Sequence, residues 1–379
     1  MPIDLAEFGK KLNRCRTQLQ LSIAELASGT GFSTERIEAF ENGTATPTGD
    51  DVLILADCFK CDYRFFISNE QLAGFEQTDA LYRMHGNEFS KEDRRSVLEF
   101  IFLCECEQQL ADELHRPVER FDFAPKGNYF KGHAEQAAKA LRNHFGYAPN
   151  AVPSDVYADF RKIGFHVFRR RLQNSNISGV TIKHPVAGTC ILVNYDEDVY
   201  RQRFTAAHEA AHGILDRDQD VVVSFATSSA REPLIEVRAN AFAARYLLPP
   251  ALVSQIPVRH WTQEEALKWS SHFKVSTSTL AFSLKEGGAI DDDEARFLRS
   301  VRLPKELKID PELSNLPSQV LKRKRELLEL GLSTYYVDLC FQALSQGIVS
   351  AGRIAEIMQV NDFELAEIAT LFGLSVRTI

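Results

Sequence analysis

The segment RFTAAHEAAHGIL, residues 203–215, constrains this chain more than any other feature of its sequence. It places His208 and His212 four residues apart, with Glu209 directly after the first histidine. On a helix, residues four apart share one face and lie about one turn from each other. Both imidazoles can therefore face one metal ion while the glutamate lies alongside, as in an HExxH zinc helix. The alternative is a buried helix with two hydrogen-bonded histidines.

A catalytic zinc ion normally takes three protein ligands and leaves one position open. The downstream segment REPLIEVRANAFAARYLLPP can supply the third. We predict a helix over about residues 233–247, on which Glu236 and Asn240 share a face, with Glu236 as ligand and Asn240 hydrogen-bonded to a ligating histidine. Glu232 is the competing ligand, but Pro233 places it at the helix boundary. The alternative for Glu236 is a solvated surface carboxylate.

These residues predict metal-assisted peptide hydrolysis. Zinc lowers the pKa of its bound water to roughly 7. Glu209 would take the proton as general base and pass it to the departing amine. Two imidazoles and a carboxylate also suit other ions, so Mn2+ and Fe2+ stay open beside Zn2+. Tyr246, Tyr195 and His184 are open candidates for stabilising the oxyanion.

The sequence around this site predicts a mixed α/β region. The metal-site helix should begin near Asp198. Three β-rich runs should form a small sheet; they are residues 165–172, 177–183 and 189–194. Further helices are expected from apolar spacing and end signals; they cover residues 133–146, 152–164, 317–331, 334–347, 350–360 and 362–373.

The first 68 residues predict a bundle of about five short helices. Leu5, Phe8 and Leu12 fall at helical spacing. Ser22 and Ser33 can each cap a short helix, and the turn SGTGF joins the two. Two short helices joined by a glycine-bearing turn are the plan of a helix-turn-helix.

A long helix is expected from Ser90 to His115, with SKED as its capping box. We interpret it as a spacer between two domains. The following segment RFDFAPKGNYFKG is interpreted as the linker into the next domain.

The net charge of −8 is unevenly distributed: −3 over residues 1–68, −7 over 69–125 and +2 over 126–379. Nucleic acid attracts basic surfaces, so the net negative charge of the first domain disfavours binding to it. The basic runs 169–171 and 322–325 could contact nucleic acid, although such runs are more often a solvated strand edge and a solvated helix face.

Several features favour a cytoplasmic protein without a membrane partner. No apolar run is long enough to cross a bilayer, and the first residues do not resemble a signal peptide. Seven cysteines are an odd number, which suggests reduced thiols. Cys58 and Cys61 form a lone CxxC pair that we expect to pack in a helix, with metal or redox use as the alternative.

The runs ISGVTIKHPVAGTCILVNYDEDVYRQRFTAAHEAAHGILD and EVRANAFAARYLLPP resemble the ImmA/IrrE family of bacterial metallopeptidases over roughly residues 130–285. The resemblance implies a small zincin fold around zinc. It implies the ligands His208, His212 and Glu236 and the general base Glu209. The chain departs from the family at the residue before the second histidine, where the family usually has glycine and this chain has Ala211. Alanine is small enough that we expect the metal site to form.

The segment LSIAELASGTGFSTERIEAFENG resembles the XRE (Cro/repressor-type) helix-turn-helix over residues 5–67. The resemblance places residues 33–38 at the major groove. The expected DNA contacts are Ser33, Thr34, Glu35, Arg36 and Glu38. Arg36 can pair with guanine, and a glutamate can accept from cytosine. We predict operator binding as a homodimer, with protein docking by the same bundle as the alternative.

The expected fold is α+β and multidomain. It comprises an all-α helix-turn-helix bundle (1–68), a helical spacer (69–125), a small zincin-like metallopeptidase domain with a short β-sheet and the HExxH helix (126–290), and an all-α C-terminal domain (291–379). By resemblance, the function is that of a zinc-dependent endopeptidase and transcriptional regulator that cleaves a repressor or another regulatory protein under stress. The alternative is a non-proteolytic DNA-binding regulator or antitoxin that binds a partner protein such as a toxin. Intact ligands favour catalysis, and a blocked cleft would favour binding.

Overall fold

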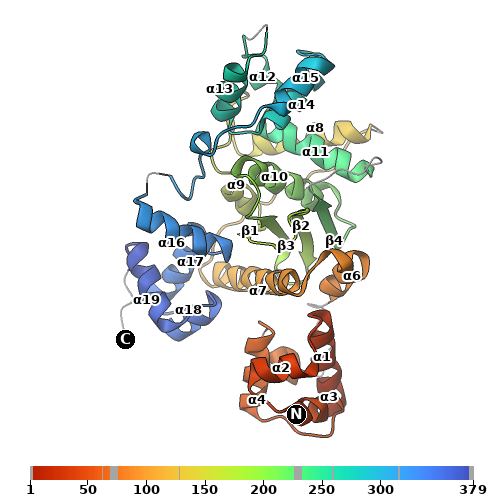
Figure 1. Ribbon diagram of the computed structural model, residues 1–379, viewed down its shortest axis with the longest axis vertical. Helices are drawn as coiled ribbons and strands as arrows, with labels where there is room; N and C mark the ends of the chain where they lie inside the picture. The colour runs from red at the N-terminus through yellow and green to blue at the C-terminus, as the bar shows by residue number, and fades with distance from the viewer. Residues whose placement is uncertain are drawn as a thin grey trace.

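The computed structural model describes residues 3–61, 63–68, 76–127, 129–225, 233–257, 260–314 and 316–374. Its centre is a four-stranded sheet between two layers of helices (Figure 1). The strands are β1 (His166–Arg170), β2 (Ile177–His184), β3 (Gly188–Asn194) and β4 (Val221–Phe225). Their order is β1-β3-β2-β4, with β1 parallel to β3 and the other pairs antiparallel. The first three strands were predicted; β4 was not.

The HExxH helix, α10 (Val199–Leu215), lies across one face of the sheet against β2 and β3. Further helices share its core. They are α8 (Phe130–His144), α9 (Val156–Lys162), α11 (Leu234–Leu247), α12 (Pro250–Val253), α13 (Gln263–Phe273), α14 (Thr277–Glu286) and α15 (Asp292–Ser300). Because α15 packs against α14 and buries Leu298, this core continues past residue 290.

The other face of the sheet is covered by α6 (Glu76–His85) and α7 (Lys91–Glu113), with the short η2 (Gly86–Glu88) between them. The C-terminal helices extend this core beyond α7. They are α16 (Ser318–Glu329), α17 (Thr334–Ser345), α18 (Ala351–Ile357) and α19 (Asp362–Leu371). All four were predicted from their apolar spacing.

Helix α7 begins as the sequence predicted, but it is not merely a spacer. The Ser90 hydroxyl accepts from the Asp93 amide at 3.1 Å, and the Asp93 carboxylate accepts from the Ser90 amide at 3.2 Å. The run IFLCEC makes the middle of the helix apolar on more than one face, and such a helix is buried. Phe100 and Leu103 are accordingly buried between β1, β3 and α17.

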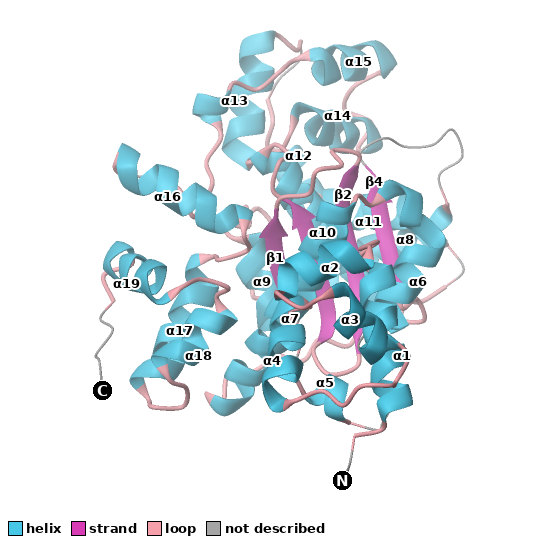
Figure 2. Cartoon of the chain, turned by 60° about the horizontal axis from the view of Figure 1, so that its bottom comes forward, coloured by secondary structure: helices cyan, strands magenta, loops and turns pink. Residues whose placement is uncertain are grey.

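The N-terminal bundle contains five helices among the described residues of 3–68: α1 (Leu5–Gln18), α2 (Ile23–Thr30), α3 (Thr34–Glu41), α4 (Gly49–Cys58) and α5 (Arg64–Ile67). The Ser22 hydroxyl caps α2 and the Ser33 hydroxyl caps α3, as predicted. In Figure 2, where the lower end of the molecule in Figure 1 is turned toward the viewer, this bundle lies in front of α7.

Helix α7 also contacts the bundle. Leu98 is buried among the apolar side chains of the bundle core. Lys91 Nζ lies 2.7 Å from Glu25 Oε1 of α2, and an Arg94 guanidinium nitrogen donates to the Gln18 carbonyl at 2.8 Å. One helix therefore touches both the bundle and the sheet.

The basic runs have structural partners, and burial of Arg169 and Arg170 corrects both of the earlier interpretations for these two residues, whereas Arg171 is exposed. Arg169 and Arg170 are buried because α16 and α7 cover the β1 edge. Arg169 pairs with Asp310 at 2.7 Å, and Arg170 pairs with Glu99. In the second run, Arg323 pairs with acids of α19.

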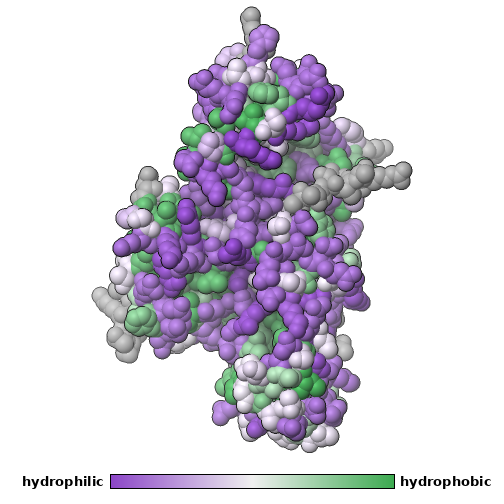
Figure 3. Space-filling model, viewed as in Figure 1, coloured by the Kyte–Doolittle hydropathy of each residue, from purple (hydrophilic) through white to green (hydrophobic). Residues whose placement is uncertain are grey.

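The predicted fold class is confirmed: a helical bundle, a small zincin-like domain with a short sheet, and a helical C-terminal region. None of the helices in the described part of the chain has the length and apolar character needed to span a bilayer. Figure 3 shows a mostly hydrophilic surface on the face it displays, with apolar side chains gathered at the outer end of the bundle.

Candidate metal centre

Helix α10 fixes two of the predicted ligands. Its first turn is capped by Asp198, whose carboxylate accepts from the Tyr200 amide at 3.0 Å. The helix is buried for nearly its whole length, so His208 and His212 are held by their surroundings. Their Nε2 atoms lie 3.1 Å apart.

Helix α11, which packs against α10, brings the third predicted ligand. Glu236 Oε2 lies 3.1 Å from His208 Nε2, and Glu236 Oε1 lies 3.4 Å from His212 Nε2. Within the described residues, these three form the one group of His, Cys, Asp or Glu side chains close enough to hold a metal ion. The competing ligand, Glu232, lies outside the described residues.

The spacing of the donor atoms fits one ion. Zinc takes nitrogen and oxygen ligands at roughly 2.0–2.2 Å in a tetrahedral arrangement, so such donors lie roughly 3.3–3.6 Å apart. The separations of 3.1 to 3.4 Å around His208, His212 and Glu236 are close to this range. Two imidazoles and a carboxylate are also a donor set that zinc accepts.

Each histidine ring is oriented through its other nitrogen. His208 Nδ1 lies 3.0 Å from Asn240 Oδ1, and His212 Nδ1 lies 2.8 Å from Asp216 Oδ2. Both partner oxygens accept, so each Nδ1 carries a hydrogen and each Nε2 is the ring nitrogen turned toward the other ligands. Asp216 was not predicted, although its position four residues after His212 on the same helix was a usable signal.

The charges of the three ligands stabilise one another. Burial opposes ionisation of His208, but its hydrogen bond to Glu236 and the nearby carboxylates outweigh burial and raise its pKa. Burial likewise raises the pKa of Glu236, yet the hydrogen bond and charge of His208 outweigh it and lower that pKa overall. Glu236 therefore stays ionised beside the imidazoles, as a carboxylate must to serve as a metal ligand.

Glu209 is fully buried beside this group. Its Oε2 accepts from the Thr181 hydroxyl at 2.6 Å, whereas its Oε1 has no hydrogen-bond partner among the described residues. Burial raises the pKa of the Glu209 carboxyl, and the charges of His208 and His212 oppose that rise. A Cβ at Gly179 would lie 2.6 Å from Oε1, so strand β2 needs glycine there to make room for the carboxylate.

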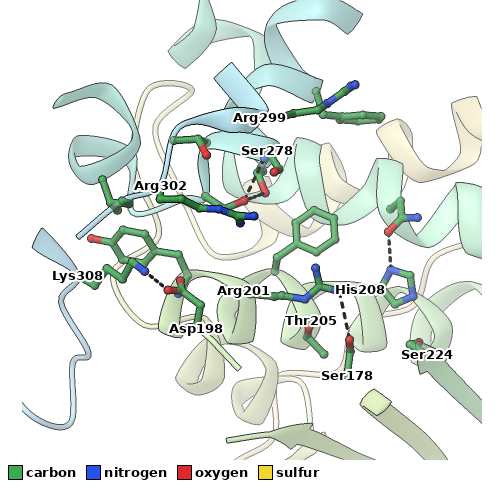
Figure 4. Close-up of a pocket in the computed structure, with 18 of the residues that line it drawn as sticks. Ser178, Asp198, Arg201, Thr205, His208, Ser224, Ser278, Arg299, Arg302 and Lys308 are labelled. Atoms are coloured by element: carbon green, nitrogen blue, oxygen red, sulfur yellow. Dashed lines mark hydrogen bonds and ion pairs between the residues drawn. The ribbon is translucent and has the colours of Figure 1, made fainter. Parts of the chain in front are cut away.

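A pocket of about 540 Å³ opens beside the centre and is lined by His208, Glu236 and Asn240 (Figure 4). Its opposite wall comes from α14, α15 and residues 301–308. Helices α16–α19 contribute none of the described residues that line it. Of the region after residue 290, only α15 and residues 301–308 border this pocket, and α16–α19 do not cover it.

The three oxyanion candidates all have other partners, and none of them lines the pocket. The Tyr246 hydroxyl donates to Asp159 at 2.8 Å in the core. His184 lies 3.0 Å from a Glu105 carboxylate oxygen. The Tyr195 ring lies beneath the guanidinium of a buried arginine, Arg169.

The expected DNA contacts lie on the first half of α3. Ser33, Glu35, Arg36 and Glu38 are exposed and Thr34 is half-buried. Arg36 is not free, because one of its guanidinium nitrogens donates to both Asp51 carboxylate oxygens at 2.7 and 2.9 Å. The exposed face of this helix is therefore more acidic than the sequence alone indicated.

Cys58 and Cys61 pack, partly buried, against the core of the bundle. Burial raises the pKa of the Cys58 thiol, which makes a reactive thiolate less accessible. Neither cysteine joins a metal-binding group among the described residues. These contacts agree with the expected role in helix packing.

A buried HExxH helix on a short mixed sheet, with an acidic donor from the next long helix, has the architecture of a zincin-like metallopeptidase domain. Residues 160–285 match a peptidase family model described as the IrrE N-terminal-like domain, and residues 12–66 match one described as helix-turn-helix. The two matches confirm the predicted fusion of a metallopeptidase-type domain to an XRE-type helix-turn-helix. No curated protein matched the chain.

Proposed function

We propose that this protein is a zinc-dependent endopeptidase that cleaves a regulatory protein. The observation that carries the proposal is the convergence of His208, His212 and Glu236 from two helices at the edge of an open pocket. We assign these three side chains as ligands. A site that opens to a pocket suits a hydrolase better than a scaffold, because a substrate can reach it.

A divalent ion held there would supply Lewis-acid chemistry by polarising a peptide carbonyl and making a water molecule more acidic. Glu209 is the general base in this proposal. The Thr181 hydroxyl holds one of its oxygens, which leaves Oε1 to take the proton of the attacking water and pass it to the leaving amine. Asn240 and Asp216 keep the histidine rings turned toward the ion.

The test combines metal analysis with a matched variant. The purified full-length chain should contain about one zinc per molecule, measured by plasma mass spectrometry. Glu209→Gln should keep the metal and the fold but lose cleavage of a peptide library prepared from a whole proteome. The loss should be about 100- to 10,000-fold, the usual contribution of a general base. Equal cleavage by both proteins would remove Glu209 from the mechanism.

We also propose that the helix-turn-helix makes the protein a DNA-binding regulator, which the match over residues 12–66 supports. Gel shifts with genomic fragments should show complexes that weaken steeply as salt rises, because operator binding releases counterions. Complexes that are insensitive to salt, or no complexes at all, would favour the protein-docking alternative. Homodimer formation on the operator stays a prediction.

The antitoxin alternative also stays a prediction. It requires a partner protein that binds without being cut, and the open pocket beside His208 does not favour it. A pull-down with the Glu209→Gln variant separates the two functions. A trapped protein that the unaltered chain cleaves is a substrate, whereas one that stays intact with both forms is a binding partner.

A further inference from the structure

The pocket beside the metal centre carries more positive than negative charge. Its lining includes four cations: Arg201, Arg299, Arg302 and Lys308. Two carboxylates also line it: Asp198 and Glu236. Lys308 pairs with Asp198, and Arg201 Nε donates to Glu197 at 2.7 Å. These two cations are therefore already neutralised.

Arg299 and Arg302 differ from the other two cations. Both are exposed, and no carboxylate among the described residues lies within ion-pair distance of either. The acids of α15 lie in its first turn, and two of them pair elsewhere: Asp292 with Lys285 and Asp293 with Arg296. Arg299 has a longer-range attraction to Asp292 but forms no ion pair among the described residues, so the end of α15 that faces the pocket stays net positive.

The wall that bears these arginines is anchored at both ends. The Thr277 hydroxyl donates to the Val301 carbonyl at 2.8 Å, and Val301 is buried in the core. The Tyr200 hydroxyl donates to the Leu307 carbonyl at 3.1 Å. Figure 4 shows Arg201 rising from α10 and Arg302 reaching into the same space from the segment after α15. These two bonds hold the backbone that carries Arg302 against α14 and α10.

We propose that Arg299 and Arg302 form a subsite that binds an acidic side chain of the peptide substrate, Asp or Glu, next to the scissile bond. This inference rests on the proposed peptidase function. Guanidinium groups pair strongly and directionally with carboxylates. Phe204, Phe282 and Leu303 also line the pocket, and their apolar surface can pack against a polypeptide. The subsite lies beyond residues 160–285, so it is a feature of this chain outside the matched domain.

Binding is measured first, with the Glu209→Gln variant so that the probe stays intact. The probes are two pools of fluorescein-labelled peptides that are identical except that every Asp and Glu of one is Asn or Gln in the other. Fluorescence anisotropy should show the acidic pool binding about tenfold more tightly or better. The preference for the acidic pool should disappear when Arg299→Gln and Arg302→Gln are added. Replacing both arginines with glutamate should instead favour a pool of lysine-containing peptides.

Arg296→Gln is the matched control, because Arg296 lies on the same helix, is exposed and does not line the pocket. It should leave the preference unchanged. Equal binding of the two pools, or a preference that survives the double substitution, overturns the subsite. Displacement of the acidic pool by an oligo(dT) strand also overturns it, since the pocket would then accept nucleic acid.

The subsite and the peptidase function can fail separately. Cleavage by the otherwise unaltered Arg299→Gln, Arg302→Gln chain should fall for acidic peptides and persist for neutral ones, with metal content unchanged. If the chain cleaves neither pool but still binds the acidic pool through these arginines, the peptidase proposal fails while the subsite stands. Cleavage of both pools at equal rates supports the peptidase and removes the subsite.

Discussion

Asp216 contacts both His212 of α10 and Arg238 of α11, and so links these two helices. The carboxylate accepts from Nδ1 of His212 at 2.8 Å, and its other oxygen pairs with Arg238 of α11. Asp216 caps the end of α10, and Arg238 lies two residues after Glu236 on α11. These contacts therefore orient the His212 ring and hold the helix that carries Glu236.

Asp216→Asn should weaken metal binding by about 10- to 100-fold, the usual effect of losing a partner that orients a ligand. Competition with a chromophoric chelator measures the affinity, and circular dichroism checks that the fold is kept. Asp218→Asn changes an exposed residue two positions away and should have no effect. An unchanged affinity in Asp216→Asn would show that His212 is oriented by packing alone.

Gly179→Ala should impair cleavage without removing the metal. The new methyl group would lie 2.6 Å from Glu209 Oε1 and 2.8 Å from Thr205 Cγ2, so the carboxylate must move. We expect a fall in kcat of about tenfold or more and a loss of about 1–3 kcal/mol in unfolding free energy from overpacking. Gly352→Ala, with no atom within 4 Å of the added group, is the control. Full activity in Gly179→Ala would mean that the Glu209 carboxylate position does not matter.

Asp51→Asn should destabilise the start of α4 in a pH-dependent way. Burial alone would raise the pKa of Asp51, but hydrogen bonds from Thr48 and Arg36 outweigh it and lower the pKa. A lowered folded-state pKa stabilises the protein above the unfolded value of roughly 3.9, and this stabilisation is lost as the pH falls through the folded value. We expect a difference of about 1 kcal/mol at neutral pH that shrinks below about pH 4.

Hydrogen exchange of peptides covering α4 measures this difference locally, with Asp50→Asn as the exposed control.

The Asp51→Asn variant also releases Arg36 from its carboxylate partner. If Arg36 contacts DNA, Asp51→Asn should therefore tighten operator binding in gel shifts. A pH-independent difference between the two proteins would argue against an ionised Asp51 in the capping box.

Leu98→Ala should loosen the helix-turn-helix from the rest of the molecule. Leu98 is a buried side chain of α7 that packs in the bundle core, and such truncations cost about 2–5 kcal/mol. Hydrogen exchange in α1 should accelerate, whereas exchange in β2 and β3 should change less. Leu53→Ala alters an exposed leucine of the bundle and serves as the control. Uniform acceleration across bundle and sheet would show that they unfold as one unit.

The parts of the site that the sequence predicted are those set by local spacing. Two histidines four residues apart, and Glu236 four residues before Asn240, share faces on their helices whatever the rest of the fold does. The structure then brings those faces together. Helix starts at Ser22, Ser33 and Ser90 were predictable for the same reason, because each cap depends on the next three residues.

Features that depend on distant contacts were missed. Strand β4 is a short, mostly apolar segment, VVVSF, that forms a strand by pairing with β2, some forty residues earlier in the chain. The wall bearing Arg299 and Arg302 reaches the pocket only through tertiary packing of α15 on α14. The apolar run in the middle of α7 indicates a buried helix, and the interpretation of α7 as a spacer did not use this indication.

The double contact of α7 limits how the protein can be divided. Removing the first 68 residues would expose Leu98 and take away the Gln18 carbonyl that accepts from Arg94. Removing α7 as well would expose the face of the sheet that it covers. A truncated chain that begins after the bundle should therefore aggregate more readily than the intact one, and exchanging Leu98 for a polar residue would be needed to obtain the metallopeptidase-type portion alone.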